Sequence, residues 1–185
     1  METAARAIRR GGFRGVGVAD IMKEAGLTHG GFYAHFASRD ALLAEALDRA
    51  GRNSVERITK SIDASRAAGT TPLKALIDGY LSESHLRGCE SGCPVAALVS
   101  EMPRQAQEVR EAAAQRVSGL VALVGSALPE GAPADAAIAI ASQLLGALQL
   151  ARALGDNAKG KNFLSAARRS LLAQFDITNA TLTEP

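Results

Sequence analysis

The chain contains the run Val18-Ala-Asp-Ile-Met-Lys-Glu-Ala-Gly-Leu-Thr-His-Gly-Gly-Phe-Tyr-Ala-His-Phe36, in which apolar residues recur at helical spacing on either side of a glycine. Ile21, Met22 and Ala25 share one face of a helix that would run from about residue 18 to residue 25. Gly26 follows directly, and glycine readily adopts the left-handed conformation that ends a helix. The first half of the run therefore predicts a short helix with a sharp C-terminal end.

The second half of the run predicts another short helix. Leu27 would fill the corner between the two helices, and Thr28 has the side chain of an N-terminal cap. Phe32 and Phe36 are four residues apart, which places both rings on the inner face of a helix that ends near Phe36. Two short helices joined by a glycine-containing turn are typical of a helix-turn-helix, whose second helix enters the major groove of DNA.

Small side chains occupy the outward-facing start of this second helix. Thr28, His29, Gly30 and Gly31 combine two hydrogen-bonding side chains with two residues that have none. Such a surface fits a major groove about 12 Å wide and lets the backbone come close to DNA. We therefore interpret the run as the DNA-reading part of the molecule.

Outside this run the sequence predicts helices and no strands. Ala, Leu, Glu, Gln and Arg dominate, and Val and Ile do not alternate with polar residues over any useful length. Glycines and prolines divide the chain into about nine helices, with expected boundaries at Gly11-Gly12, near Gly69 and at Pro129 to Pro133. We expect an all-α protein with a three-helix domain at residues 1–48 and a larger helical domain at residues 49–185.

Composition and charge narrow the function classes. The chain has 185 residues, 47% of them apolar, which is enough for a hydrophobic core. Residues 1–60 hold ten Lys and Arg against seven Asp and Glu, whereas residues 61–185 hold eleven against twelve. No stretch approaches the ~18 uninterrupted apolar residues of a membrane span, and Arg6, Arg9 and Arg10 interrupt the region where a signal peptide would be apolar. We expect a cytoplasmic protein with no membrane partner.

The sequence gives little support to an enzyme or a metal site. His29 and His35 fall within the DNA-reading run, which leaves His85 as the one histidine outside it. The sequence shows no nucleophile matched to His85, no paired carboxylates and no phosphate-binding loop. Cys89 and Cys93 are too few for a disulfide scaffold and have no neighbours that would complete a zinc site. We predict no catalytic residues, no metal and no cofactor.

A longer set of residues resembles a known family. It consists of Gly12-Phe13, the run from Val18 to Phe36, and Ser38-Arg-Asp-Ala-Leu-Leu43. Together these residues closely resemble the DNA-binding domain of the TetR/AcrR family of repressors, densely over about residues 7–48. The remainder has little motif content apart from Gly92-Cys-Pro-Val-Ala-Ala-Leu98. The resemblance implies a repressor that binds double-stranded operator DNA and is released from it by a small-molecule effector.

The resemblance also implies a division of DNA contacts. The residues facing base edges would be Thr28, His29 and Gly30, and those facing phosphates would be Gly31, Tyr33, His35 and Arg39. The phenol of Tyr33 and the guanidinium of Arg39 both suit a phosphate acceptor. Four of these residues also have an alternative interpretation: Thr28 could be only a cap, His29 a surface residue, Tyr33 a half-buried edge of the core and His35 a helix-packing residue. Gly17 stands where relatives often carry a hydroxyl that could hold a phosphate, and the first helix begins late, so we expect weaker operator affinity than is typical.

One helix-turn-helix makes too few contacts for specificity against a genome, so such modules act as dimers on half-sites about 34 Å apart or more. The helices expected from Asp135 and from Asn162 have surplus apolar surface. In the resembled family the last two helices form a four-helix bundle with a second copy; alternatively they only close the core of one chain. The expected homodimer interface consists of Ile138, Leu145, Leu148, Leu164, Leu171 and Phe175.

A ligand cavity among the middle helices is a further implication, since its occupancy would change the separation of two reading helices. The candidate lining residues are Ile58, Ile62, Tyr80, Ser84, His85, Val99, Met102, Val109 and Val117. Most of them could equally be core residues, whereas Tyr80, Ser84, His85 and Met102 add polar or adaptable atoms to an apolar wall. We predict a small, largely apolar effector.

Two alternatives to a ligand-released repressor remain open. Cys93 and Pro94 begin an expected helix, a position that favours a reactive thiol, so Cys89 and Cys93 could form a redox or electrophile sensor. An ordinary small residue at a helix start also explains Cys93. The other alternative is a DNA-binding protein of the same fold that senses nothing and is not released by small molecules.

Overall fold

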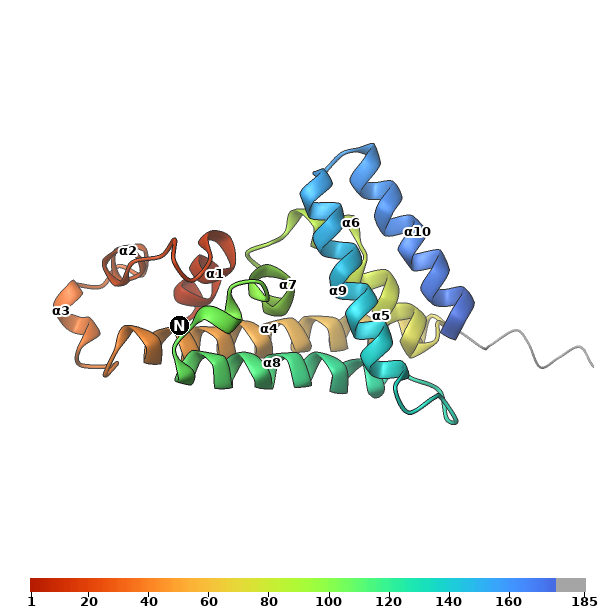
Figure 1. Ribbon diagram of the computed structural model, residues 1–185, viewed down its shortest axis with the longest axis horizontal. Coiled ribbons are helices and arrows are strands. Elements are labelled where there is room, and N and C mark those ends of the chain that lie inside the picture. Colours follow the sequence, from red (N-terminus) through yellow and green to blue (C-terminus); the bar gives the residue numbers. More distant parts are fainter. Residues whose placement is uncertain (176–185) are drawn as a thin grey trace, which may run out of the picture. The chain divides into compact units, whose positions relative to one another are not determined.

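The computed structural model describes residues 1–175, apart from the side chain of His29. In this part of the chain the residues form ten α-helices, one short 3-10 helix and no strand (Figure 1). The elements are α1 (Glu2–Gly11), α2 (Val18–Glu24), α3 (His29–Phe32), α4 (Arg39–Ala67), α5 (Pro72–Tyr80), α6 (Glu83–Arg87), α7 (Pro94–Leu98), η1 (Met102–Arg104), α8 (Gln107–Gly125), α9 (Ala136–Leu154) and α10 (Ala158–Phe175). The all-α prediction is confirmed, and its count of about nine helices is close.

Side-chain caps and left-handed glycines set several of the helix ends. Gly26 has a φ of +71° directly after α2, and Gly69 has a φ of +79° after α4, as the sequence predicts. Thr71 caps α5, since its Oγ1 accepts a hydrogen bond from the Lys74 N–H at 3.2 Å, and Pro72 occupies the first helical position.

The chain divides into two compact units, and each is built from two segments. The first unit comprises residues 1–55 and 88–119, and the second comprises residues 56–87 and 120–185. Long helices α4 and α8 contribute to both units. This grouping differs from the boundary expected at residue 48, because residues 88–119 fold with the N-terminal helices.

The core of the first unit joins the N-terminal helices to the later segment. Phe13, Leu43 and Leu47 are fully buried there, together with Leu98 and Val109 from residues 88–119. The N-terminal helices therefore do not complete a hydrophobic core on their own.

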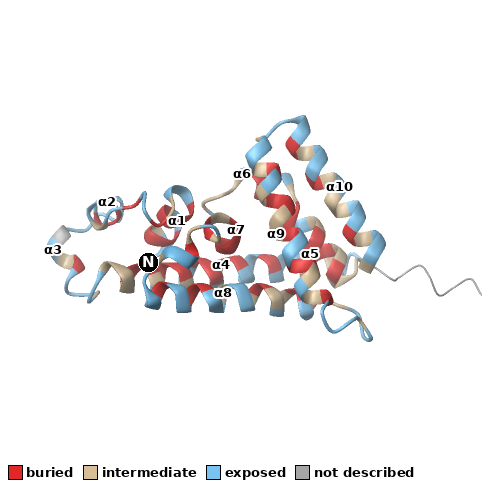
Figure 2. Ribbon diagram, in the orientation of Figure 1, coloured by how far each residue is buried: buried red, intermediate tan, exposed pale blue. Residues whose placement is uncertain are grey.

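Helices α9 and α10 dominate the second unit, where they lie side by side as a hairpin (Figure 1). Ile140, Leu144 and Leu148 of α9 are fully buried, as is Leu171 of α10, so a buried stripe runs along both helices (Figure 2). Among residues 1–175, α9 is also the one helix whose length and apolar composition would suffice to cross a membrane. Its packing against α10 accounts for that composition.

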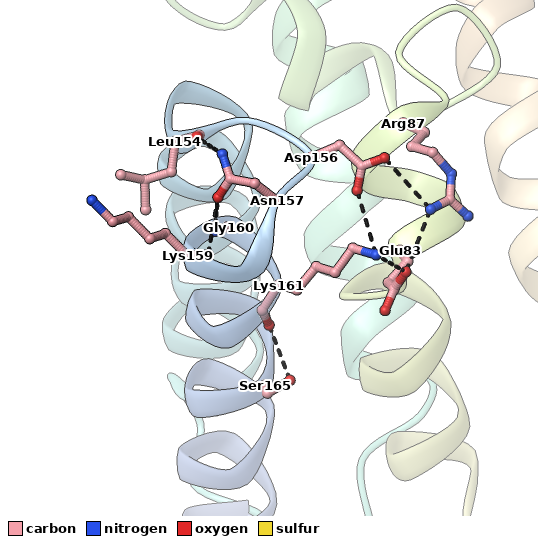
Figure 3. Close-up of polar contacts among 9 residues, drawn as sticks. All are labelled: Glu83, Arg87, Leu154, Asp156, Asn157, Lys159, Gly160, Lys161 and Ser165. Atoms are coloured by element: carbon pink, nitrogen blue, oxygen red, sulfur yellow. Dashed lines mark hydrogen bonds and ion pairs between the residues drawn. The ribbon is translucent and has the colours of Figure 1, made fainter.

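The turn between α9 and α10 is tight. Gly155 has a φ of +91°, and Asn157 donates to the Leu154 carbonyl at 2.6 Å while accepting from the Lys159 N–H at 2.9 Å (Figure 3). A Cβ on Gly160 would lie 2.1 Å from the Gly155 carbonyl oxygen. Only glycine allows the backbone at residue 160 to approach the Gly155 carbonyl oxygen this closely.

An exposed ion-pair network connects α6 to the same turn. Lys161 Nζ lies 2.8 Å from a Glu83 carboxylate oxygen, and Arg87 lies 3.4 Å from Glu83 and 3.6 Å from Asp156 (Figure 3). The hydrogen bond from Lys161 lowers the pKa of Glu83. Because exposed pairs are worth little singly, the network helps to orient α6 rather than to stabilise the fold strongly.

Candidate nucleic-acid interface

Helices α2 and α3 form the helix-turn-helix that the sequence predicts; we refer to residues 18–36 as the reading head. Ile21, Met22 and Phe32 are buried between its elements, and Phe36 stacks on Phe32 with ring centroids 5.7 Å apart. The prediction that Leu27 fills the corner is wrong, because its side chain is 55% exposed. Instead its backbone N–H donates to the Met22 carbonyl at 2.8 Å, which closes the turn.

Helix α3 is shorter than predicted. It spans four residues and continues as a turn, in which the N–H groups of His35 and Phe36 both donate to the Phe32 carbonyl at 3.0 Å. Thr28 caps the helix as predicted, since its Oγ1 accepts a hydrogen bond from the Gly31 N–H at 3.3 Å. The cap uses one acceptor site of the hydroxyl and leaves its proton available to an outside partner.

The residues predicted to face DNA form an exposed surface around α3. Thr28, Gly30 and His35 are exposed, and Tyr33 is 70% exposed with its ring edge on Phe32. Gly31 is half-buried. The side chain of His29, predicted to face bases, lies outside the described residues.

The two glycines of α3 have no structural requirement within the chain. Neither has a positive φ. A Cβ on Gly30 would meet nothing within 4 Å, and a Cβ on Gly31 would make only ordinary contacts with Thr28 and Met22 at 3.6 and 3.8 Å. Glycine in a helix interior is destabilising by about 1 kcal/mol relative to alanine, and no contact within the chain accounts for glycine at these two positions.

Arg39, predicted to face a phosphate, binds the backbone of the loop that precedes α2. Its Nη2 donates to the Phe13 carbonyl and also to the Val16 carbonyl at 3.3 Å. Its side chain remains 41% exposed. The guanidinium thus fixes the loop to the first turn of α4.

A residue that the sequence did not indicate holds the same loop from another side. Glu101 Oε2 accepts a hydrogen bond from the Phe13 N–H at 3.0 Å. Gly12 has a φ of +74°, and a Cβ there would lie 2.3 Å from Glu101 Oε1. Glu101 and Arg39 together therefore set where the chain enters α2. The Gly12-Phe13 pair signals a turn, but nothing in the sequence marks a partner 88 residues away.

Much of the positive charge in the first unit is already paired. Arg10 binds Glu24 at 2.7 Å and Glu90 at 3.5 Å, and the hydrogen bond from Arg10 lowers the pKa of Glu24. By contrast, the contacts of residues 1–175 give exposed Arg14 and Lys23 no carboxylate partner. Lys23 lies in α2 and Arg14 in the loop that precedes it, and both offer a free cation to a phosphate. Neither is among the DNA-facing residues expected from the sequence.

The loop of residues 88–93 packs against α1. Arg9 is 3% exposed and donates from Nη1 to the Gly92 carbonyl at 3.1 Å. Cys89 Sγ donates to the Arg9 carbonyl at 3.1 Å, while Cys93 is buried at the start of α7. The loop that contains both cysteines is therefore in direct contact with α1 of the first unit.

Comparisons with known proteins agree with this architecture. The family model for bacterial regulatory proteins of the tetR family matches residues 1–46, and the model for the tetracyclin repressor-like C-terminal domain matches residues 69–167. An uncharacterized HTH-type transcriptional regulator of Mycobacterium tuberculosis strain H37Rv is 31% identical over 165 residues, 83% of this chain and 82% of the relative. The chain belongs to the TetR family. It is a DNA-binding transcriptional regulator and not an enzyme.

Other transcriptional regulators have similar sequences or folds. The transcriptional repressor NemR of Escherichia coli K12 is 27% identical over 120 residues, 65% of this chain and 60% of NemR. The crystal structure of the reduced form of E. coli NemR aligns with a TM-score of 0.71 at 22% identity, over 91% of this chain and 94% of that chain. A TetR-family regulator from Cytophaga hutchinsonii aligns with a TM-score of 0.67 at 18% identity, over 94% and 91% of the two chains.

The candidate pocket residues fall in both units of this TetR-family chain. In the first unit, Val99, Met102 and Val117 border a depression of about 230 Å³, and Val109 is fully buried in the core. In the second unit, Ile62 borders a pocket of about 790 Å³, whereas Ile58 is buried and Ser84 is exposed. Tyr80 and His85 pack edge to face with ring centroids 4.8 Å apart, so they belong to the interior of the second unit.

His85 is held as a neutral imidazole. Its Nδ1 lies 2.8 Å from the Tyr80 carbonyl oxygen, and its own carbonyl accepts a hydrogen bond from Arg152 at 2.7 Å. Burial is the main cause that lowers the pKa of His85 to about 4, and the charges of Arg152 and Arg57 lower it further.

The six candidate interface residues differ in burial. Leu148, Leu164 and Leu171 are buried by the packing of α9 on α10, so they stabilise a single chain. Ile138 is 58% exposed, and Leu145 and Phe175 are half-buried. The hairpin also exposes Leu150, Leu154 and Phe163, which are not among the six interface residues expected from the sequence.

Proposed function

We propose that this TetR-family regulator is a homodimeric repressor that binds operator DNA through α3 and releases it when a small, largely apolar effector binds. The observation that carries the proposal is the outer surface of α3, where Gly30 and Gly31 have neither a positive φ nor a crowded Cβ position. Absent side chains at these positions allow the backbone to approach a groove closely. As a regulator of DNA, the protein would act in the cytoplasm.

In this proposal Thr28, His29 and Gly30 face base edges. Gly31, Tyr33 and His35 face phosphates, and exposure of Tyr33 and His35 supports that role. Arg39 contributes chiefly by fixing the loop before α2, with the exposed part of its side chain directed to the backbone of the operator. Free cations at Arg14 and Lys23 replace the hydroxyl contact that Gly17 lacks.

Exposed apolar side chains on α9 and α10 support the proposed homodimer. Ile138, Leu150, Leu154 and Phe163 are each at least 40% exposed, although they are large and apolar. A helical hairpin with such a face is suited to pair with the same face of a second copy. Leu145 and Phe175 extend this proposed interface.

The experiment is an operator-binding assay on DNA flanking the protein's own gene, across a range of salt concentrations. His29→Ala should reduce the preference for the operator over unrelated DNA, because a good base contact is worth about 1–3 kcal/mol. Lys23→Gln should instead weaken binding to every sequence and reduce the salt dependence by about one counterion. Lys159→Gln, an exposed lysine of α10, is the matched control and should change neither. Absence of binding to the flanking DNA at every salt concentration would refute the repressor.

A second candidate is a repressor that responds to thiol oxidation. The hydrogen bond from Cys89 to the Arg9 carbonyl favours it, because oxidation of this thiol would remove a contact with α1. Mild oxidation with hydrogen peroxide should then weaken operator binding by the wild type but not by Cys89→Ser. Equal binding before and after oxidation would exclude this mechanism.

A further inference from the structure

A pocket in the second unit lies where α4 and α8 end and α5 begins. It has a volume of about 790 Å³ and is formed by the last turns of α4, the first turn of α5, and the end of α8 with the segment that follows. Pockets for small organic ligands have volumes of roughly 300–1,000 Å³. Only Ile62 was among the pocket residues expected from the sequence.

Apolar side chains form much of the pocket wall. Leu73 is buried, whereas Ile62, Leu123 and Leu128 are only half-buried and retain apolar surface exposed to solvent. These four side chains come from α4, α5, α8 and the segment after α8. An apolar body of a ligand would cover surface that water now contacts.

The charged groups at this pocket have a negative balance. Asp63, Arg66 and Glu130 line it and are exposed, and among residues 1–175 none of the three has an ion-pair partner within 4.0 Å. The last carbonyls of α4 and α8 accept hydrogen bonds from the residues that follow, among them Arg66 O from the Gly69 N–H and Val124 O from the Ala127 N–H. At the start of α5, the Lys74 N–H is likewise satisfied by the Thr71 side chain. The helix ends are therefore capped, and the two carboxylates outweigh the one guanidinium.

We propose that this pocket binds a lipophilic organic cation, with the cationic centre near Asp63 and Glu130 and the apolar groups on Ile62, Leu123 and Leu128. The proposal rests on the proposed function, because the bound cation is the effector that releases operator DNA. Arg66 weakens the site for a cation and would favour a lipophilic anion, so a cation and an anion of the same shape distinguish the two charge classes.

The test uses tetraphenylphosphonium and tetraphenylborate, which have nearly the same shape and opposite charges. Isothermal titration of the full chain should show tetraphenylphosphonium binding at least about tenfold more tightly than tetraphenylborate. Asp63→Asn and Glu130→Gln should each weaken tetraphenylphosphonium binding about three- to fivefold, and Arg66→Gln should strengthen it by a similar factor. Glu108→Gln, an exposed carboxylate on α8 outside the pocket, is the control and should leave binding unchanged.

Binding to the operator is measured separately, so the two proposals can fail independently. The cation should weaken operator binding by the wild type, and Asp63→Asn with Glu130→Gln should require more cation for the same release. If the protein binds its operator but prefers tetraphenylborate, or if neither carboxylate variant changes cation binding, the cation site is refuted and the repressor stands. If the cation binds as expected without releasing DNA, its role as the effector is refuted. Failure of the ligand-free protein to bind operator DNA refutes the repressor itself.

Discussion

Glycine has opposite roles in α3 and in the α9–α10 hairpin. At Gly160 a Cβ would lie 2.1 Å from the Gly155 carbonyl oxygen, so the fold itself requires glycine. At Gly30 a Cβ would meet nothing within 4 Å, and the backbone has no positive φ. Contacts inside the chain therefore require glycine in the hairpin, whereas no contact inside the chain requires glycine at position 30.

Burial follows the same contrast. Helices α9 and α10 have 19 and 18 residues and share a buried stripe (Figure 2), whereas α2 and α3 have seven and four residues, and the buried ones among those described are Ile21, Met22 and Phe32. The reading head depends on other segments for its core, including Leu98 and Val109. Substitutions in the hairpin should therefore change stability, and substitutions on the outer surface of α3 should change DNA binding.

The largest expected effect is that of Gly160→Ala. Its new methyl group would clash with backbone atoms, and separating α9 from α10 should lower the free energy of unfolding by about 3 kcal/mol. Gly146→Ala on α9 is the matched control: no atom lies within 4 Å of its Cβ position, and it should raise stability by up to about 1 kcal/mol. Urea unfolding measures both variants. Equal stabilities would mean that the two helices do not approach as closely as described.

Gly30→Leu tests whether the glycine of α3 serves DNA binding rather than stability. Its side chain would project from α3 without touching the rest of the chain, so the free energy of unfolding should not fall. Operator affinity should decrease about 100-fold, or about 2.7 kcal/mol, because the added side chain keeps the backbone from the groove. Fluorescence anisotropy with labelled operator and urea unfolding separate the two effects. Wild-type affinity in this variant would contradict a close backbone approach at Gly30.

Acidification should lower the stability of the second unit, which contains the hairpin, through protonation of His85. The folded-state pKa of His85 is about 4, below the ordinary 6.5, so the unfolded chain binds the proton more readily between these values. Stability from this residue is complete above pH 6.5 and is lost as the pH falls toward 4. Between pH 8 and pH 5 the loss should be about 2 kcal/mol.

Urea unfolding at a series of pH values measures this slope. His85→Gln removes the titrating group, and it should lose that part of the pH dependence even though it is less stable at pH 8. An unchanged slope in His85→Gln would assign the acid sensitivity to other groups.

Local patterns in the sequence predicted most helix ends, because the side chain or conformation that ends a helix lies within a few residues of it. Gly26 and Thr71 are examples. The reading head was predictable for the same reason. The positions of Leu27 and Leu148 were not, because an apolar residue is compatible with the corner, the chain interior or a second copy, and only tertiary packing decides among them.

Glu101 shows the limit of local patterns most clearly, and it gives the smallest of the expected effects. Its carboxylate accepts a hydrogen bond from the Phe13 N–H, 88 residues earlier in the chain, and no local pattern in the sequence indicates this partner. Glu101→Ala would leave this part-buried N–H without its acceptor and release the loop before α2, so operator affinity should fall about fivefold, or about 1 kcal/mol. Unlike Gly30→Leu, it should also lower the free energy of unfolding, by a similar amount.

Glu101→Gln distinguishes the hydrogen bond from the charge. The amide keeps an oxygen that can accept from the Phe13 N–H, so affinity should remain within about twofold of the wild type if the hydrogen bond positions the loop. Glu108→Ala, an exposed glutamate of α8, controls for the lost negative charge and should not weaken binding. If Glu101→Gln loses as much affinity as Glu101→Ala, the carboxylate acts through its charge. If neither changes affinity, the hydrogen bond from the Phe13 N–H to Glu101 does not position the reading head.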